Sequence, residues 1–74
     1  MPISPSADVA DNATIGNGSS VWHLAQVREG ATIGQSCTIG RGAYIGVGVQ
    51  VGDNCKIQNY ALVYEPASLA DGVF

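Results

Sequence analysis

The sequence predicts an all-β chain that winds into a triangular parallel β-helix, and three observations lead to this fold class. From position 3 onward every sixth residue is a large aliphatic, and eleven of these twelve are Val or Ile. A second column, four residues after each aliphatic, is small or β-branched throughout. The third residue after each aliphatic is most often Gly or Asn, the residue types that best tolerate a positive φ.

The six-residue period excludes an α-helix, because about 3.6 residues per turn would carry the aliphatic positions around its whole surface. In a strand, residues two apart point to the same side, so each hexapeptide is interpreted as one short strand followed by one corner. Three such edges close a coil, and residues one coil apart then stack at about 4.8 Å. Twelve hexapeptides therefore predict about four coils. The inward stacks are all aliphatic: Ile3-Val21-Ile39-Ile57, Val9-Val27-Ile45-Val63 and Ile15-Ile33-Val51-Leu69.

In the first predicted coil, residues 1–20, no residue indicates a chemical function. The second coil departs from the repeat. Trp22 and Arg28 stand where glycine is usual, and the corner residues become His23 and Leu24. The third coil, residues 33–50, returns to the rule. Departures from a repeat are where function is expected.

The fourth coil departs again, and stacking places its departures on the same faces as those of the second coil. Gln58 is predicted to lie two rungs from Trp22, and Tyr64 two rungs from Arg28. The residues that replace small ones or glycine here are Gln58, Asn59, Tyr60, Tyr64 and Glu65.

Cys37 and Cys55 are separated by one coil and are predicted to stack in the inward column of small residues. Their side chains would point the same way on neighbouring rungs. This arrangement favours two reduced core thiols over a disulfide.

Composition limits the partners that the chain can have. The 74 residues carry a net charge of −3, and the three basic residues are scattered along the sequence, which argues against nucleic acid as a partner. No apolar run reaches membrane-spanning length, and no signal peptide is recognisable, so we expect no membrane partner and a cytoplasmic location. We expect residues 1–74 to be a single β-helix domain and the N-terminal portion of a longer protein, because the period predicts a further aliphatic directly after Phe74.

Four stretches carry a resemblance to a known family. Val21-Trp22-His23-Leu24, Cys55-Lys56-Ile57-Gln58-Asn59, Val63-Tyr64-Glu65 and Gly72-Val73-Phe74 resemble the hexapeptide-repeat acyltransferases. The similarity is greatest to the N-acetyltransferases that acetylate an amino group on a nucleotide-linked sugar. It covers the whole chain but only the first part of that family's length, and Tyr60 and Pro66 depart from the family pattern.

The resemblance implies a left-handed parallel β-helix and a homotrimer with acetyl-CoA, as co-substrate, between neighbouring subunits. The family's proposed catalytic residue follows the Gly-Val-Phe stretch, so no catalytic residue is assigned to this chain. We therefore expect the 74 residues alone to be inactive. No metal site is expected, because a zinc site of the kind found in β-helical carbonic anhydrases needs several histidines and the chain has one.

The candidate substrate-binding residues each have a structural alternative. His23 could orient a sugar hydroxyl or act as a base, or it could be an exposed corner residue. Arg28 could bind a pyrophosphate, or it could pair with Glu29 or Glu65. Trp22 could pack against a partner subunit or against a nucleotide base. The remaining four could contact the sugar or form side-chain ladders and solvated faces: Gln58, Asn59, Tyr64 and Glu65.

Two functions remain open on the sequence. The first is transfer of acetyl from acetyl-CoA to an amine of a nucleotide-linked sugar, which requires mainly positioning and the removal of one proton. The second is a non-catalytic β-solenoid that serves as a structural or assembly module.

Overall fold

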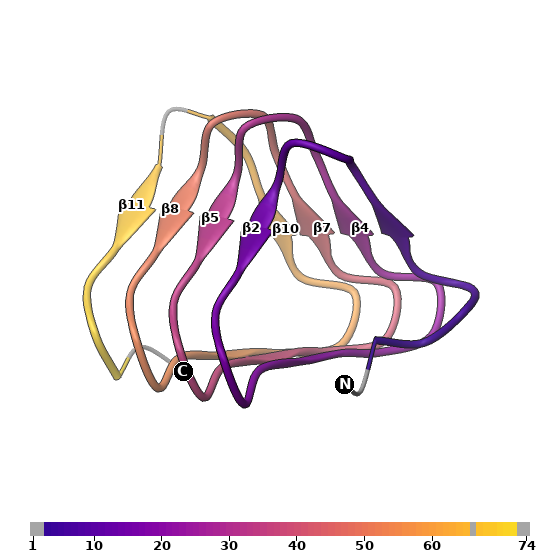
Figure 1. Ribbon diagram of the computed structural model, residues 1–74, viewed down its shortest axis with the longest axis horizontal. Helices are drawn as coiled ribbons and strands as arrows, with labels where there is room; N and C mark the ends of the chain where they lie inside the picture. The colour runs from indigo at the N-terminus through magenta and orange to yellow at the C-terminus, as the bar shows by residue number, and fades with distance from the viewer. Residues whose placement is uncertain (1–2, 66, 73–74) are drawn as a thin grey trace.

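A computed structural model describes residues 3–65 and 67–72, and it shows a coil of short parallel strands (Figure 1). Pro66 and the Val73-Phe74 stretch, which the sequence singled out, lie outside these residues. Each strand is two residues long, because a corner follows every inward aliphatic. The strands are β1 (Asp8–Val9), β2 (Thr14–Ile15), β3 (Ser20–Val21), β4 (Gln26–Val27), β5 (Thr32–Ile33), β6 (Thr38–Ile39), β7 (Tyr44–Ile45), β8 (Gln50–Val51), β9 (Lys56–Ile57), β10 (Leu62–Val63) and β11 (Ser68–Leu69).

The strands form three parallel sheets with the predicted register of eighteen residues. The sheets have the orders β1-β4-β7-β10, β11-β8-β5-β2 and β3-β6-β9. Val9 pairs with Val27, and Ile39 pairs with Ile57. A bridge from Ile3 to Val21 gives the third sheet a fourth rung. Figure 1 shows one sheet as the row β11, β8, β5, β2 in front of the row β10, β7, β4. The predicted all-β fold, with about four triangular coils, is confirmed.

The two inward columns meet inside the coil and form one core, as the sequence predicted. Toward the first and last described coils, residues such as Val9 and Val63 are only partly buried against it. The buried apolar residues are Val21, Ala25, Val27, Ala31, Ile33, Cys37, Ile39, Ala43, Ile45, Val49, Val51, Cys55 and Ile57.

The corners turn through residues with positive φ. Five of these are glycines, such as Gly42 at 68°, while Leu24 and Tyr60, both at 61°, adopt the same conformation in spite of large side chains. The reason lies in hydrogen bonding between coils, because the N–H of the positive-φ residue donates to a corner carbonyl one coil earlier, as Gly42 does to His23. At Leu24 the Ser6 hydroxyl accepts this bond instead, at 3.1 Å.

Side chains of Asp and Asn add a second set of bonds between coils. The Oδ1 atom of Asp53 accepts the backbone N–H of Gln35 at 2.8 Å. This contact needs a glycine on the coil below, because a Cβ on Gly34 would lie 2.3 Å from that same oxygen. Asn59 and Asp71 form equivalent bonds to backbone N–H groups of the preceding coil. Asn12 acts as Ser6 does, because its Oδ1 atom accepts the N–H of the positive-φ residue Gly30 on the following coil.

One inward column contains buried polar groups that all donate to carbonyls. The Ser19 hydroxyl donates to the carbonyl of Gly34 at 2.7 Å and accepts the N–H of Cys37 at 2.9 Å. The thiols of Cys37 and Cys55 repeat the donation on the next two coils, at 3.0 and 3.1 Å. Both cysteines are free and buried, as predicted. Burial raises the pKa of the Cys37 thiol.

No helix long and apolar enough to cross a membrane occurs in residues 3–65 and 67–72.

Candidate functional site

The departures at Trp22 and Gln58 border a hollow on the β3-β6-β9 sheet and its following corner. Trp22, Gly40 and Gln58 directly follow β3, β6 and β9, so the eighteen-residue register stacks them on successive rungs. Since Gly40 has no side chain, it leaves a gap between its larger neighbours. The resulting open hollow has a volume of about 680 Å³ and is called here the Trp22–Asn59 hollow. Its lining includes Trp22, His23, Gly40, Arg41, Lys56, Gln58 and Asn59.

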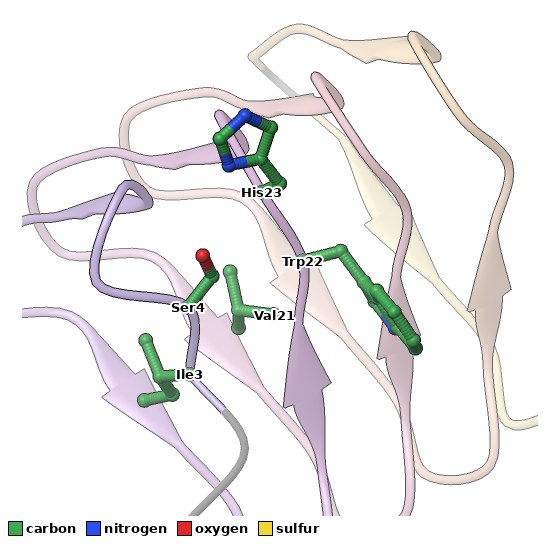
Figure 2. A pocket seen from close by; sticks show the side chains of 5 residues that line it. All are labelled: Ile3, Ser4, Val21, Trp22 and His23. Atoms are coloured by element: carbon green, nitrogen blue, oxygen red, sulfur yellow. The ribbon is translucent and has the colours of Figure 1, made fainter.

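A second, smaller hollow of about 320 Å³ lies toward the N-terminal end of the same sheet. It is lined by Ile3, Ser4 and Val21 together with Trp22 and His23. Figure 2 shows that the side chains of Trp22 and His23 project in different directions from consecutive positions. These two residues belong to the lining of both hollows.

His23 is held at the corner by the first coil. Its Nδ1 atom forms a hydrogen bond with the Ser6 hydroxyl, which also contacts the Ser4 hydroxyl at 3.0 Å. If the Ser6 proton points to Ser4, Nδ1 carries a proton and Nε2 can act as a base. If it points to Nδ1, Nε2 is a donor. The direction of this short chain of hydroxyls therefore selects the chemistry that His23 offers.

Asn59 is partly committed to the fold, whereas Gln58 forms no side-chain hydrogen bond within residues 3–65 and 67–72. The Oδ1 atom of Asn59 accepts the N–H of Arg41 at 2.9 Å, which is the ladder alternative considered from the sequence. Its amide nitrogen has no hydrogen-bond partner among the residues that the structure describes. Gln58 lies exposed on the rim of the hollow with both its donor and its acceptor available.

Arg28, Tyr64 and Glu65 lie at the next corner and do not line the Trp22–Asn59 hollow. The Arg28 guanidinium pairs with Asp8 at 2.9 Å and with Glu29 at 3.0 Å. The hydrogen bond to Glu29 is the main cause that raises the pKa of Arg28, and the same bond lowers the pKa of Glu29. The predicted alternative of a pair with Glu29 is thus observed.

Tyr64 packs against another ring instead of facing the hollow. Its ring centroid lies 5.4 Å from that of Tyr44, with the two planes tilted by 49°. The six candidates therefore separate into a group at the hollow (His23, Gln58 and Asn59) and a group at the next corner (Arg28, Tyr64 and Glu65). Their roles in substrate binding stay predictions.

The repeat pattern matches a known family over most of the chain. Residues 12–47 and 30–65 both match the family described as bacterial transferase hexapeptide (six repeats). The chain belongs to this hexapeptide transferase family. The left-handed coil that the sequence resemblance implies agrees with this match. No curated protein matches the chain significantly.

Three residues at the site of this hexapeptide transferase chain are absent from the candidates that the sequence gives. Arg41 and Lys56 are scattered in the sequence, yet both line the Trp22–Asn59 hollow. Neither cation breaks the repeat pattern, and the stacking of Arg41 one coil away from both His23 and Asn59 places it at the hollow only once these two residues are known to line it. Ser6 was missed as well, since its contact to His23 joins two corners that the column pattern treats separately.

The hollow of this hexapeptide transferase chain offers hydrogen bonds and positive charge. Among the residues that the structure describes, no three His, Cys, Asp or Glu side chains come together to hold a metal ion. What the site presents is one imidazole, two amides, two cations and an indole ring. Such a set can bind a polar anionic substrate and can accept one proton.

Proposed function

We propose that this chain is part of an acetyl-CoA-dependent N-acetyltransferase that acts on an amino group of a nucleotide-linked sugar. Membership of a family of bacterial transferases supports acyl transfer as the reaction type. The observation that carries the proposal is the convergence of His23, Gln58 and Asn59 on one hollow. The finer substrate class rests on the resemblance of the Trp-His and Lys-Ile-Gln-Asn stretches.

In the proposed reaction the neutral amine attacks the thioester carbonyl, the thiolate of CoA leaves, and the amine loses one proton. Gln58 and the free amide nitrogen of Asn59 would hold sugar hydroxyls. His23 would take or relay the proton when its Nε2 atom is unprotonated. Holding the two reactants in register supplies much of the rate enhancement, so a rigid corner suits this chemistry.

A homotrimer is part of the proposal, and exposed apolar side chains support it. They gather on the outer face of the β1-β4-β7-β10 sheet and the corners beside it. Monomeric proteins rarely leave so many large apolar side chains exposed together. These side chains are Leu24, Val47, Tyr60, Leu62 and Tyr64.

The test is an acetyl-transfer assay on the purified protein in its full natural length. Release of the CoA thiol is followed with acetyl-CoA and a panel of nucleotide-linked amino sugars. We expect Gln58→Ala to raise the KM for the sugar about tenfold, since a lost hydrogen bond of this kind is worth about 1.5 kcal/mol. Gln50→Ala, on the β8 face away from the hollow, is the matched control and should leave the kinetics unchanged.

A protein that forms trimers but neither binds acetyl-CoA nor releases thiol would contradict the proposal. That result would favour the alternative of a non-catalytic β-solenoid that serves in structure or assembly.

A further inference from the structure

We propose that the Trp22–Asn59 hollow binds the phosphate groups of a nucleotide through Arg41 and Lys56, with Trp22 stacked on the base. The identity of the ligand as a nucleotide rests on the proposed function. The choice of residues rests on the structure, because Arg41 lies outside the stretches that carry the resemblance and Lys56 was not among the candidate substrate-binding residues. The inference moves the phosphate-binding role from Arg28 to these two cations.

The distribution of charge is the first argument. Of the three basic residues, Arg28 is neutralised by Asp8 and Glu29. Within residues 3–65 and 67–72, Arg41 and Lys56 form no ion pair, and both line the hollow. The lining contains no Asp or Glu. On a chain of net charge −3, this hollow is therefore where positive charge is unopposed and can bind an anion.

The indole ring is the second argument, because it selects among anions. Trp22 is 56% exposed, although burying an indole is usually favourable. It stands on the rung next to Gly40, where the sheet has no side chain, so a flat ligand can reach the ring. Stacking of a base on an aromatic side chain contributes about 1–3 kcal/mol. An anion that carries a planar aromatic group fits both features, and a nucleotide is such an anion.

Two nucleotides take part in the proposed reaction and share this chemistry. The sugar substrate carries a nucleoside diphosphate, and CoA carries an adenosine phosphate. Uridine diphosphate and adenosine 3′,5′-bisphosphate serve as separate probes for the two sources.

The experiment uses the protein's own fluorescence, because Trp22 is the only tryptophan of this sequence. Each probe is titrated into the protein at low salt, and quenching of Trp22 is recorded. We expect one probe to quench the emission with a Kd that rises at least tenfold in the double variant Arg41→Gln/Lys56→Gln.

The matched control is Thr14→Glu/Gln50→Glu, which lowers the net charge by the same two units but on exposed positions of β2 and β8. It should bind the probe within a factor of two of the unmodified protein. Circular dichroism and a thermal melt check that both double variants are folded.

The outcomes separate cleanly. Quenching by uridine diphosphate that depends on Arg41 and Lys56 assigns the hollow to the sugar nucleotide, and the same behaviour of adenosine 3′,5′-bisphosphate assigns it to the acetyl donor. The inference is overturned if neither probe quenches, or if both double variants weaken binding equally. Acetyl transfer without nucleotide binding at the hollow would sink this inference alone. Binding without acetyl transfer would sink the proposed function alone.

Discussion

At the scale of single residues, the corners depend on paired choices on successive coils. Asp53 reaches down to the N–H of Gln35 through space that only a glycine at position 34 leaves open. The pair Gly40 and Asn59 repeats the arrangement at another corner. In both pairs the acceptor follows the glycine by nineteen residues, and nineteen residues after Trp22, which replaces the glycine, the chain has Arg41, whose side chain has no acceptor oxygen. Because Trp22 replaces the glycine, position 41 does not need a short acceptor and can hold an arginine.

Removing one of these acceptors should destabilise the coil. We expect Asp53→Ala to lower the free energy of unfolding by about 1–2 kcal/mol, because the N–H of Gln35 loses its partner. Asp53→Asn keeps an oxygen in place and should restore most of the stability. Urea denaturation measures both. Asp11→Ala removes an exposed corner carboxylate that forms no side-chain hydrogen bond within the described ranges, and it should have little effect. Equal losses in the two alanine variants would contradict the role given to Asp53.

The left-handed conformation of Leu24 allows a stabilising substitution. A non-glycine residue loses about 1–2 kcal/mol at its φ of 61°, and within a single chain Leu24 is too exposed to lose much burial. The comparison is therefore made on the Leu62→Glu background, in which the proposed trimer contact is broken. Part of the gain is offset because glycine is more flexible in the unfolded chain. We expect Leu24→Gly to stabilise the protein by about 0.5–1 kcal/mol in a thermal melt. Val47→Gly, at an exposed corner position without positive φ, should destabilise it instead. A lower melting temperature for Leu24→Gly would contradict this reasoning.

Some features of individual residues could be predicted from the sequence and others could not. The corner positions were predictable, because glycine and asparagine mark them in most repeats. The contact of Ser6 with His23 was not, since it depends on two rotamers and not on a column. Arg28 forms ion pairs with both Asp8 and Glu29, and the sequence predicted only the pair with its neighbour Glu29. Asp8 lies on the previous coil, so its contact with Arg28 is not evident from their positions in the sequence.

At the scale of elements, the column Ser19-Cys37-Cys55 is a stack of buried donors. Each side chain donates a hydrogen bond to a backbone carbonyl, so the column contributes hydrogen bonds to the core as well as packing. Ser19 forms one more hydrogen bond than either cysteine, because its oxygen also accepts the N–H of Cys37.

Ser19→Ala should therefore cost about 3 kcal/mol of unfolding free energy, since it leaves a buried carbonyl and a buried N–H without partners. Ser19→Cys keeps a donor, as the two cysteines of the same column do, and should cost clearly less. Guanidinium denaturation with a shared m-value compares the two variants. If both are equally destabilised, the effect is one of packing and the hydrogen bonds are not its cause.

The Cys37 thiol predicts a loss of stability in alkali. Burial raises its pKa in the folded protein, so the folded state holds the proton more tightly than the unfolded state does. The resulting stability is complete below the unfolded thiol pKa of about 8.5 and is lost as pH rises through the higher folded value. Cys37→Ser keeps a donor that does not titrate in this range. Its melting temperature should fall less between pH 8 and pH 10.5 than that of the unmodified protein, and parallel curves would contradict the prediction.

At the scale of the whole molecule, the fold was almost fully predictable and the site only in part. A strict period fixes strand length, register and inward faces together, so a single pattern determines the coil. The site is a sum of exceptions to that pattern. His23, Gln58 and Asn59 could be found because they break the rule. Arg41 and Lys56 stand at outward positions where the rule allows any polar residue, and so they carried no signal.

The proposed trimer gives a prediction for the molecule as a whole. Leu62 is 59% exposed on the outer face of the β1-β4-β7-β10 sheet. If this face packs against another subunit, Leu62→Glu places a charge in an apolar interface and should shift the sedimentation coefficient from trimer to monomer. Gln50→Glu makes the same change of charge on another sheet and should leave the assembly intact. A trimer that survives Leu62→Glu would place the contact on a different face.

The eighteen-residue register has a consequence for how such a chain can change in length. Deleting one hexapeptide would move every later residue to another face of the triangle, so that the coils on the two sides of the deletion would stack with different partners and a site that spans it would be split between faces. Deleting or duplicating three consecutive hexapeptides would only shorten or lengthen the stack. Insertions and deletions in the gene are thus tolerated in whole-coil steps, and the ancestry of the chain is expected to be a history of complete coils gained and lost.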